Sequence, residues 1–319
     1  MELECKICHN KTENNQFTVR EMMFGFRDEF YYFQCSRCGC IQIVERPKNM
    51  DKYYPEGYYS FASRQINRTL FQRCKSVLYK QLIDYYLGNF NIFGKLLSIN
   101  YKNPFRWIKK NMLNFNSSIL DVGCGSGKLP LKLHQFGFTN IIGIDPYNKE
   151  DIFYENGVSI YKKEISQMEG QFDFIILHSS FEHMWQPLDV MKNLYRLLKP
   201  SGYIMIRIPV ANGYAWRKYG INWVNFDAPR HFFLHTTSSM AILADQSQLK
   251  LIDVVYDSYN FQFWGSEQYL RNITFAQTKG KPYYFSPKEL KEYQKESERL
   301  NKIKDGDTAF FYFKKVNAK

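Results

Sequence analysis

Four cysteines near the start of the chain have the residue type and spacing of a metal site. Cys5 and Cys8 form one C-x-x-C pair, and Cys35 and Cys38 form a second pair further along the chain. Two such pairs can direct four thiolates at one ion, and zinc in structural sites takes four tetrahedral ligands. We therefore predict a structural zinc site with these four ligands, carried by strand-like segments as in a zinc ribbon.

Two alternatives to this ligand set remain open in the sequence. His9 and Cys40 lie directly beside the cysteine pairs, so either could replace one of the four ligands. A redox-active C-x-x-C is the other alternative, although one pair would be enough for that chemistry. Four cysteine ligands would leave no open position for water, so we expect the metal to be structural rather than catalytic.

A glycine-rich turn supplies a second candidate site. Residues 121–127 read Asp-Val-Gly-Cys-Gly-Ser-Gly and lie between a strand-like segment and a helical segment. Glycine permits the positive backbone φ of a tight strand-to-helix turn and lets a ligand lie against the backbone. Asp145 ends the next apolar segment, where a carboxylate can accept hydrogen bonds from both hydroxyls of a ribose. The turn therefore predicts a ligand that contains a nucleoside.

The spacing of the glycines favours S-adenosylmethionine over a dinucleotide. The pattern is G-x-G-x-G after an aspartate, whereas dinucleotide-binding turns read G-x-G-x-x-G. S-adenosylmethionine has no pyrophosphate to bind at a helix N-terminus, and its ammonium group suits the carboxylate of Asp121. We therefore expect S-adenosylmethionine as the cofactor and keep NAD only as a remote alternative.

The segments around this turn must place it at the edge of a sheet. Strand-like and helical patterns alternate from residue 117 onwards. This alternation predicts an α/β fold with a mostly parallel sheet covered by helices on both faces. Ligands of such sheets bind beyond the carboxyl ends of the strands. The expected strands cover residues 119–122, 141–145, 158–161, 172–177, 203–208, 249–256 and 309–316.

These motifs resemble the class I, Rossmann-like methyltransferases that use S-adenosylmethionine. Residues 119–127 match the glycine-rich first motif of that family, residues 143–146 its acidic second motif, and residues 172–183 and 197–203 its later motifs. The resemblance implies a seven-stranded sheet with an antiparallel last strand, and a cofactor and substrate lined by the residues after the fourth strand. The cofactor-binding residues that it implies are Asp121, Gly123, Cys124, Gly125, Gly127, Asp145, Pro146, His178 and Ser179.

The chain as a whole resembles bacterial methyltransferases of sugar and surface-polysaccharide biosynthesis. The resemblance rests on the order of the cysteine ribbon, a tyrosine-rich segment, the core and residues 227–233. It implies a small-molecule acceptor, a sugar or a nucleotide-linked sugar. His231 is suited to remove a proton from a sugar hydroxyl, and Arg230 could hold a phosphate or carboxylate. Alternatively, His231 caps or orients the helix that follows it.

Two further groups are candidates for the site. Glu182 and His183 follow the expected fourth strand, close to the expected position of the transferred methyl group, and are a second candidate catalytic pair. They could instead only open the next helix, where an acidic side chain suits the helix dipole. Tyr54 and Tyr58 could stack on a substrate ring or pack between ribbon and core.

The patterns divide the chain into three parts. We expect a zinc ribbon at 1–46, a helical linker on the substrate side at 47–112, and a class I methyltransferase domain at 113–319 with an insertion over about 259–304. The sequence has no apolar stretch long enough to span a membrane and no signal peptide. We therefore expect a cytoplasmic protein.

The charge of the chain bears on its partner. The net charge of +12 fits a phosphate-bearing partner. The charge appears spread along the chain without a dense basic run, which disfavours nucleic acid. An RNA methyltransferase whose ribbon binds RNA is the alternative function, and a binding protein without enzymatic activity is a third.

Overall fold

The computed structural model describes residues 3–55, 70–101, 103, 105–109 and 112–316. The chain divides into two compact units. Unit 1 comprises Met1–Glu56, Ser179–Lys192 and Ile206–Val316, and unit 2 comprises Gly57–His178, Asn193–Met205 and Asn317–Lys319. The division cuts across the three parts expected from the sequence, because the N-terminal ribbon shares unit 1 with the C-terminal third of the chain.

Unit 1 contains an antiparallel sheet built mostly from the ribbon. Within the described residues its strand order is β1-β2-β3-β10. The cysteine pairs flank β1 and β2, which confirms the strands expected there. β10 pairs with β3 although the two strands lie almost two hundred residues apart in the sequence. The bounds are β1 (Asn15–Arg20), β2 (Glu29–Gln34), β3 (Ile41–Ile43) and β10 (Phe233–Leu234).

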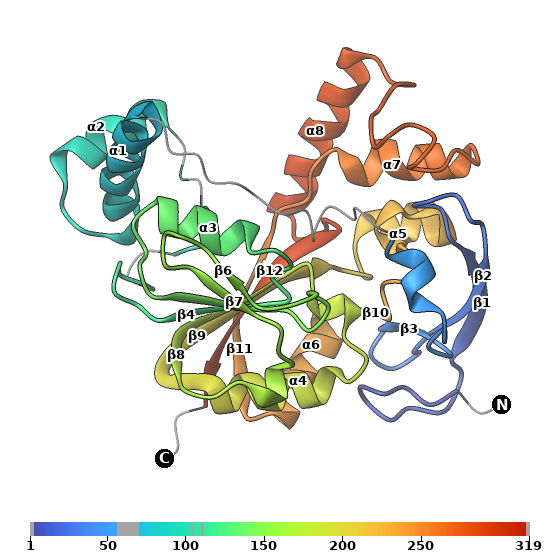
Figure 1. Ribbon diagram of the computed structural model, residues 1–319. Helices are drawn as coiled ribbons and strands as arrows, with labels where there is room; N and C mark the ends of the chain where they lie inside the picture. Colours follow the sequence, from blue (N-terminus) through green and yellow to red (C-terminus); the bar gives the residue numbers. More distant parts are fainter. Residues whose placement is uncertain (1–2, 56–69, 102, 104, 110–111, 317–319) are drawn as a thin grey trace. The chain divides into compact units, whose positions relative to one another are not determined.

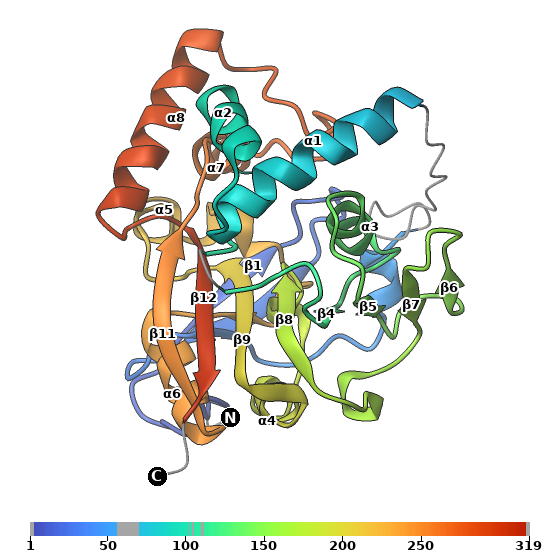
Figure 2. The same cartoon turned by 90° about the vertical axis from the view of Figure 1, so that its left-hand side faces the viewer.

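The central sheet has the order β11-β12-β9-β8-β4-β5-β7-β6 among the described residues, and Figure 2 shows most of these strands side by side. β4 is parallel to β5 and β8, β5 is parallel to β7, and β12 is antiparallel to β11. The mostly parallel α/β sheet is thus confirmed. The bounds are β4 (Ile119–Val122), β5 (Ile141–Ile144), β6 (Ile152–Phe153), β7 (Ser159–Tyr161), β8 (Phe172–His178), β9 (Leu198–Pro209), β11 (Leu249–Tyr256) and β12 (Thr308–Lys315).

The expected number of seven strands was one too low. The additional strand is β6, a two-residue strand that pairs antiparallel with β7 at the edge of the sheet. So short a segment shows no period in the sequence by which it could be recognised.

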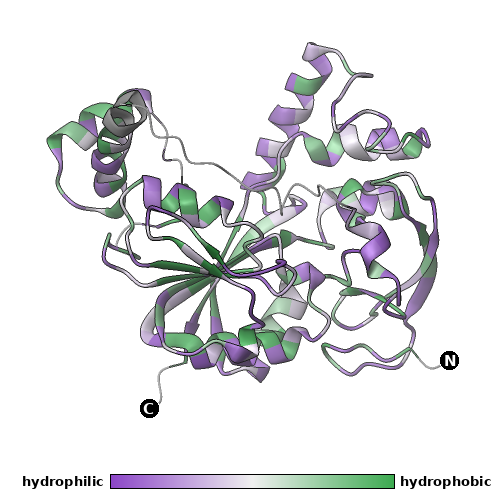
Figure 3. Cartoon of the chain, viewed as in Figure 1, coloured by the Kyte–Doolittle hydropathy of each residue, from purple (hydrophilic) through white to green (hydrophobic). Residues whose placement is uncertain are grey.

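Helices alternate with the strands after residue 117, as the pattern of the sequence predicts. Figure 1 shows the helices, and Figure 3 shows α8 as mostly hydrophilic and the strands of the central sheet as mostly hydrophobic. The bounds are α1 (Leu70–Leu87), α2 (Ile92–Asn100), α3 (Lys128–Gln135), α4 (Pro187–Leu197), α5 (Tyr214–Tyr219), α6 (Thr237–Gln246), α7 (Phe261–Leu270) and α8 (Pro287–Lys302).

Several short 3-10 helices connect these elements. They are η1 (Met50–Tyr53), η2 (Ile165–Gln167), η3 (Phe181–His183), η4 (Gly220–Asn222) and η5 (Val224–Phe226). Two of them, η3 and η5, carry or precede candidate site residues. In the part of the chain that the structure describes, no helix is both long and apolar enough to cross a membrane.

Candidate functional site

The glycine-rich turn of unit 2 connects β4 to α3 in a conformation that requires glycine. Gly123, Gly125 and Gly127 have φ values of 72°, 56° and 85°, a region that side chains with a Cβ rarely adopt. A Cβ on Gly127 would also lie 2.7 Å from Ile160 Cδ1. The positive φ values and the close packing of Gly127 against Ile160 therefore require glycine in this turn, and a ligand lying against its backbone stays a prediction.

Asp145 holds this turn in place from the end of β5. Its carboxylate accepts hydrogen bonds from the backbone N–H groups of Gly125 at 2.8 Å and Tyr147 at 3.0 Å. Asn148 donates from its side chain to the carbonyl oxygen of Gly125 at 2.9 Å. Asn148 had no role in the sequence prediction, since only the folded turn brings it to Gly125. The glycine-rich motif and the acidic motif around Asp145, which are separate in the sequence, are therefore linked by hydrogen bonds in the structure.

Asp121, the third residue of β4, has a buried carboxyl group. Its side chain is only 3% exposed. Burial, and next the negative charge of Asp145, raise the pKa of Asp121 to about 8. A cation bound beside Asp121 would favour its ionised form, because an opposite charge stabilises a carboxylate. The electrostatics of unit 2 therefore fit a ligand with an ammonium group.

The remaining residues expected to bind the cofactor lie near these strand ends. Cys124 and Pro146 are half-buried within the two turns, and His178 is the exposed last residue of β8. Ser179 follows in unit 1, where its backbone N–H donates to the carbonyl of Arg207 at 2.9 Å and its hydroxyl accepts from the Arg207 side chain at 3.3 Å. Their contacts with a cofactor stay predictions.

The four predicted metal ligands come together in the ribbon. Cys5, Cys8, Cys35 and Cys38 offer sulfur atoms that all lie within 4.8 Å of one another. The Sγ separations of 3.6 Å for Cys5 and Cys38 and 3.5 Å for Cys8 and Cys35 exclude a disulfide in either pair. They approach the edge of about 3.8 Å that a zinc tetrahedron with four thiolates has. The donor set and its geometry fit zinc.

Neither alternative ligand joins this cluster. His9 lies at the exposed surface, with its Nδ1 3.1 Å from a carboxylate oxygen of Glu4. Cys40 is fully buried, with its Sγ 3.8 Å from Nδ1 of His235. The four cysteines of the two pairs are therefore the set that the geometry favours.

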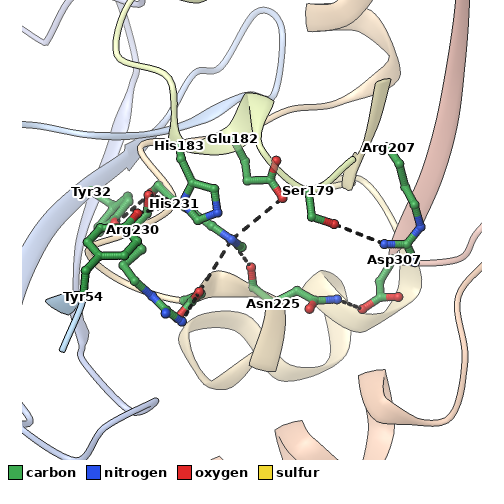
Figure 4. A network of polar contacts seen from close by, with 11 residues as sticks. Tyr32, Tyr54, Ser179, Glu182, His183, Arg207, Asn225, Arg230, His231 and Asp307 are labelled. Atoms are coloured by element: carbon green, nitrogen blue, oxygen red, sulfur yellow. Dashed lines mark hydrogen bonds and ion pairs between the residues drawn. The ribbon is translucent and has the colours of Figure 1, made fainter. Parts of the chain in front are cut away.

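A polar cluster in unit 1 contains both candidate catalytic pairs, and Figure 4 shows most of it from close by. It combines the 3-10 helix that follows β8 with the loop between η5 and β10. Its rings and charged groups touch one another, with the rings of His183 and His231 4.8 Å apart between centroids. We call it the His231 cluster and define it as Tyr54, Glu182, His183, Asp227, Arg230 and His231.

His231 is oriented through one ring nitrogen and keeps the other one available. Its Nδ1 lies 2.8 Å from the carbonyl oxygen of Asn225, which can only accept, so Nδ1 carries the proton. Its Nε2 lies 3.6 Å from Asp227 Oδ2 and 3.9 Å from Glu182 Oε1. Burial lowers the pKa of His231. The ring is therefore neutral at pH 7, with Nε2 as a proton acceptor.

The neighbouring histidine is also held neutral. His183 has its Nδ1 2.8 Å from the carbonyl oxygen of Arg230 and 3.3 Å from the hydroxyl of Tyr54. Burial, and next the positive charges of His231 and Arg230, lower the pKa of His183 to about 3. Tyr54 thus contacts His183, and its contact with a substrate stays a prediction, whereas Tyr58 lies outside the described residues.

Glu182 places a second carboxylate close to His231. Its side chain is 1% exposed, and its Oε2 has no hydrogen-bond partner among the residues that the structure describes. Burial raises the pKa of Glu182 to about 8, although its own backbone N–H and Arg207 act in the opposite direction. A buried acceptor of this kind is costly without a partner. With a pKa of about 8, the Glu182 carboxyl is protonated at pH 7, so it can donate a hydrogen bond to a bound hydroxyl group or accept one from it.

Arg230 is neutralised inside the cluster. Its guanidinium contacts both carboxylate oxygens of Asp227, with distances of 2.6 and 2.5 Å from Nη2, and it lies over the rings of Phe24 and Tyr54. The ion pair lowers the pKa of Asp227 against the effect of burial. Because Arg230 already holds a carboxylate of the protein, its contact with a substrate phosphate stays a prediction.

Three members of the cluster could hold a metal ion. Donor atoms of Glu182, His183 and His231 lie within 4.8 Å of one another. However, the positive charge of Arg230 lowers the pKa of both histidines and would oppose a cation for the same reason. Proton transfer is the chemistry that fits this cluster better.

The ribbon supports His231 directly. The hydroxyl of Tyr32 in β2 donates to the carbonyl of His231 at 3.0 Å. The next residues, Phe233 and Leu234, pair with β3. The following helix α6 is capped by Thr236, whose hydroxyl accepts from the backbone of Ser239. His231 is therefore not the helix cap, and the position of its backbone depends on the ribbon, which the sequence did not reveal.

Comparisons with known proteins agree with the methyltransferase motifs. Residues 97–254 match a family model described as a methyltransferase domain. A ubiquinone biosynthesis O-methyltransferase of Pseudomonas aeruginosa strain UCBPP-PA14 is 28% identical over 177 residues, which are 50% of this chain and 76% of the relative. The corresponding enzyme of Pseudomonas fluorescens strain SBW25 matches over the same shares of both chains, also at 28% identity.

Among solved structures, two methyltransferases align with this chain at low TM-scores. One is a putative S-adenosylmethionine-dependent methyltransferase of Listeria monocytogenes, with a TM-score of 0.42, 14% identity, and coverage of 65% of this chain and 95% of the other. Another is the magnesium protoporphyrin IX methyltransferase of Synechocystis PCC 6803, with a TM-score of 0.40, 11% identity, and coverage of 84% and 95%.

Proposed function

The chain carries a class I methyltransferase domain and is an S-adenosylmethionine-dependent methyltransferase, and we propose that it methylates a hydroxyl group of a sugar or nucleotide-linked sugar. The observation that carries this proposal is the neutral ring of His231, with Nδ1 held by the carbonyl of Asn225 at 2.8 Å and Nε2 available. A hydroxyl group needs such a base, because its oxygen must lose a proton when it accepts a methyl group.

The donor is proposed to bind at the glycine-rich turn of unit 2. Asp145 would accept the ribose hydroxyls, and the carboxylate of Asp121 would face the ammonium group. The positive φ values of Gly123, Gly125 and Gly127 form the tight strand-to-helix turn that such a donor site needs. Bound there, S-adenosylmethionine supplies an electrophilic methyl group on a sulfonium.

The proton is proposed to move to Nε2 of His231. S-adenosylmethionine held at the glycine-rich turn would supply the methyl group to the acceptor oxygen and would become S-adenosylhomocysteine. The hydroxyl proton passes to Nε2, and the imidazolium is stabilised by the carboxylate of Asp227 at 3.6 Å. Glu182 would orient the acceptor through its buried Oε2, and water later removes the proton from His231.

The place of Glu182 in the sequence supports the His231 cluster as the acceptor site. Glu182 follows the end of β8 at His178 by only four residues. In α/β sheets, ligands bind beyond the carboxyl ends of the strands. The class I resemblance implies the same for the residues after the fourth strand. We therefore propose the His231 cluster as the acceptor site.

The ribbon is proposed to hold a structural zinc ion through Cys5, Cys8, Cys35 and Cys38. Its strand β3 is paired with β10, so this strand supports the acceptor loop. This arrangement favours a small-molecule enzyme over one whose ribbon serves to bind RNA.

The relatives named above as ubiquinone biosynthesis O-methyltransferases support transfer to oxygen on a small molecule. The sugar assignment rests on the order of ribbon, tyrosine segment and residues 227–233.

The proposal is tested by supplying the purified protein with methyl-labelled S-adenosylmethionine and separate acceptor pools. The pools are nucleotide-linked sugars, surface glycans, phenolic quinone precursors and total RNA. We expect label on an oxygen of the sugar pool. Label on phenols alone would show that the acceptor is a phenol and not a sugar. Label on RNA alone would contradict a small-molecule acceptor.

Asp145→Ala is expected to weaken the binding of S-adenosylmethionine by about 100-fold, because two hydrogen bonds to a charged group are lost. The substitution also removes the acceptor that holds the backbone of Gly125. Isothermal titration measures the change. Glu150→Ala, at an exposed acidic residue five positions later, is the matched control and should bind like the wild type. Equal binding by the Asp145 variant would refute this donor site.

A further inference from the structure

An apolar surface without a described partner covers the helical hairpin formed by α1 and α2. Phe90 in the connecting turn is 87% exposed, and Phe93 and Ile99 on α2 are 72% and 75% exposed. Ile92 and Leu96 extend the same surface with exposed fractions of 61% and 58%. Scattered exposed apolar residues are ordinary, but a contiguous group of this kind marks an interaction surface.

The hairpin does not need these residues for its own packing. α2 lies so close to α1 that a Cβ on Gly94 would be 2.3 Å from the carbonyl oxygen of Gln81. Asn91 caps α2 by accepting from the backbone N–H of Gly94. Tyr79 on α1 packs its ring against Phe136, with centroids 4.9 Å apart. The inner side is thus occupied within unit 2, and the exposed side is left for a partner.

Basic residues are concentrated in the same part of the sequence. Residues 70–112 contain eight Lys or Arg and a single acidic residue, Asp84, so this short segment supplies +7 of the net charge of +12. The basic residues are Arg73, Lys75, Lys80, Lys95, Lys102, Arg106, Lys109 and Lys110.

We propose that the α1–α2 hairpin docks the protein on the surface of an anionic lipid bilayer. A short helix with aromatic and aliphatic side chains on one face and lysines beside it lies in the interface with its apolar face among the lipid headgroups. Basic residues beside such a helix are attracted by anionic lipids. The helices are too short and polar to cross a membrane, so this contact is peripheral.

Two other partners fit the hairpin less well. A second copy of the chain in a twofold contact would bring two hairpins together whose residues 70–100 each carry four basic residues and one acidic residue, a net charge of +3, which opposes association. Single-stranded RNA would use the aromatic rings for stacking. Base stacking on the aromatic rings would not explain why the aliphatic side chains of Ile92, Leu96 and Ile99 are also exposed. The combination of aliphatic side chains and positive charge is the one that lipid complements.

Sedimentation of the full chain with vesicles tests this proposal without reference to methyl transfer. We expect binding to vesicles of phosphatidylglycerol mixed with phosphatidylcholine, and binding weaker by about tenfold or more to phosphatidylcholine alone. High salt should also weaken binding, because it screens the attraction of the basic residues.

The double variant Phe93→Ser with Ile99→Ser is expected to lose about tenfold in vesicle affinity, since both side chains are exposed and their removal leaves the packed side intact. Lys95→Glu should weaken binding to the anionic vesicles only. The control is Tyr283→Ser with Tyr284→Ser, at two exposed aromatic residues of unit 1, which should bind like the wild type. Circular dichroism checks that each variant is folded.

Three outcomes would overturn the proposal. One is a folded wild type that does not sediment with anionic vesicles. Another is an equal loss in the control and hairpin variants. The third is a dimer in light scattering that the hairpin variant converts to a monomer while vesicle binding stays unchanged, which would assign the surface to a second copy of the chain.

Discussion

His231→Gln is expected to lower kcat for methyl transfer by about 100- to 10,000-fold, the usual contribution of a general base, and to leave the affinity for S-adenosylmethionine within about twofold, because the donor site belongs to unit 2. Glutamine keeps a polar side chain of similar length, but its amide cannot take a proton at neutral pH. Steady-state kinetics with the identified acceptor and titration of the donor measure the two effects separately.

The pH profile distinguishes a base from a merely structural histidine. Burial lowers the pKa of His231 from its ordinary value, so its basic form is present above that lowered pKa and is lost as the pH falls through it. The wild type should therefore lose its activity only at a pH below the ordinary histidine pKa of about 6.5. The residual activity of His231→Gln should lack this acid limb.

A matched control comes from the exposed His9, which lies in the ribbon and pairs with Glu4. His9→Gln should retain the wild-type kcat and pH profile. If His231→Gln loses less than about tenfold in kcat, or keeps the acid limb, the assignment of His231 as general base is wrong.

The sequence could predict those parts of the site that depend on residue types and spacings within a short stretch of the chain. The turn at Gly123, Gly125 and Gly127 requires positive φ values, and this requirement is visible as glycine spacing. The four cysteines were equally visible, because C-x-x-C pairs fix both ligand type and spacing. In both cases the residues that form the feature are close in sequence, or identical in type, so no knowledge of the fold was needed.

The parts that sequence missed depend on contacts between distant segments. Tyr32 reaches the backbone of His231 across 199 positions, and neither residue carries a local sign of the other. Helix α7 was missed for a related reason. Its residues 262–266 are all buried, so it lacks the alternation of polar and apolar faces by which a helix is recognised. The electrostatic role of Asp227 likewise appears only when its neighbours are in place.

Loss of zinc from the ribbon is expected to abolish methyl transfer while the donor still binds. Cys35→Ser removes one of four thiolates, and structural zinc in small domains contributes about 10 kcal/mol or more to folding. The ribbon should then lose its structure. β10 would lose its partner β3, and the backbone of His231 would lose its hydrogen bond from Tyr32. The donor turn lies in unit 2 and does not depend on these contacts.

Three measurements on the same samples test this expectation: zinc content by elemental analysis, kcat, and titration with S-adenosylmethionine. We expect zinc and kcat to fall together and the donor affinity to stay within about threefold, since unit 2 supplies the donor contacts. Arg37→Ala is the matched control, because Arg37 is exposed and lies between Cys35 and Cys38 in the same turn. It should keep both zinc and activity.

Tyr32→Phe separates the positioning role of the ribbon from its stability. This variant keeps all four cysteines and removes one hydroxyl, which donates at 3.0 Å to the carbonyl of His231. The loss of one buried hydrogen bond costs about 1 kcal/mol. If the lost hydrogen bond lets His231 leave its productive orientation, kcat should drop about fivefold. The KM for the donor should stay unchanged. A wild-type kcat in Tyr32→Phe, together with retained activity after zinc removal, would show that the ribbon does not position the base. The ribbon would then have a different role, such as binding another partner of the chain.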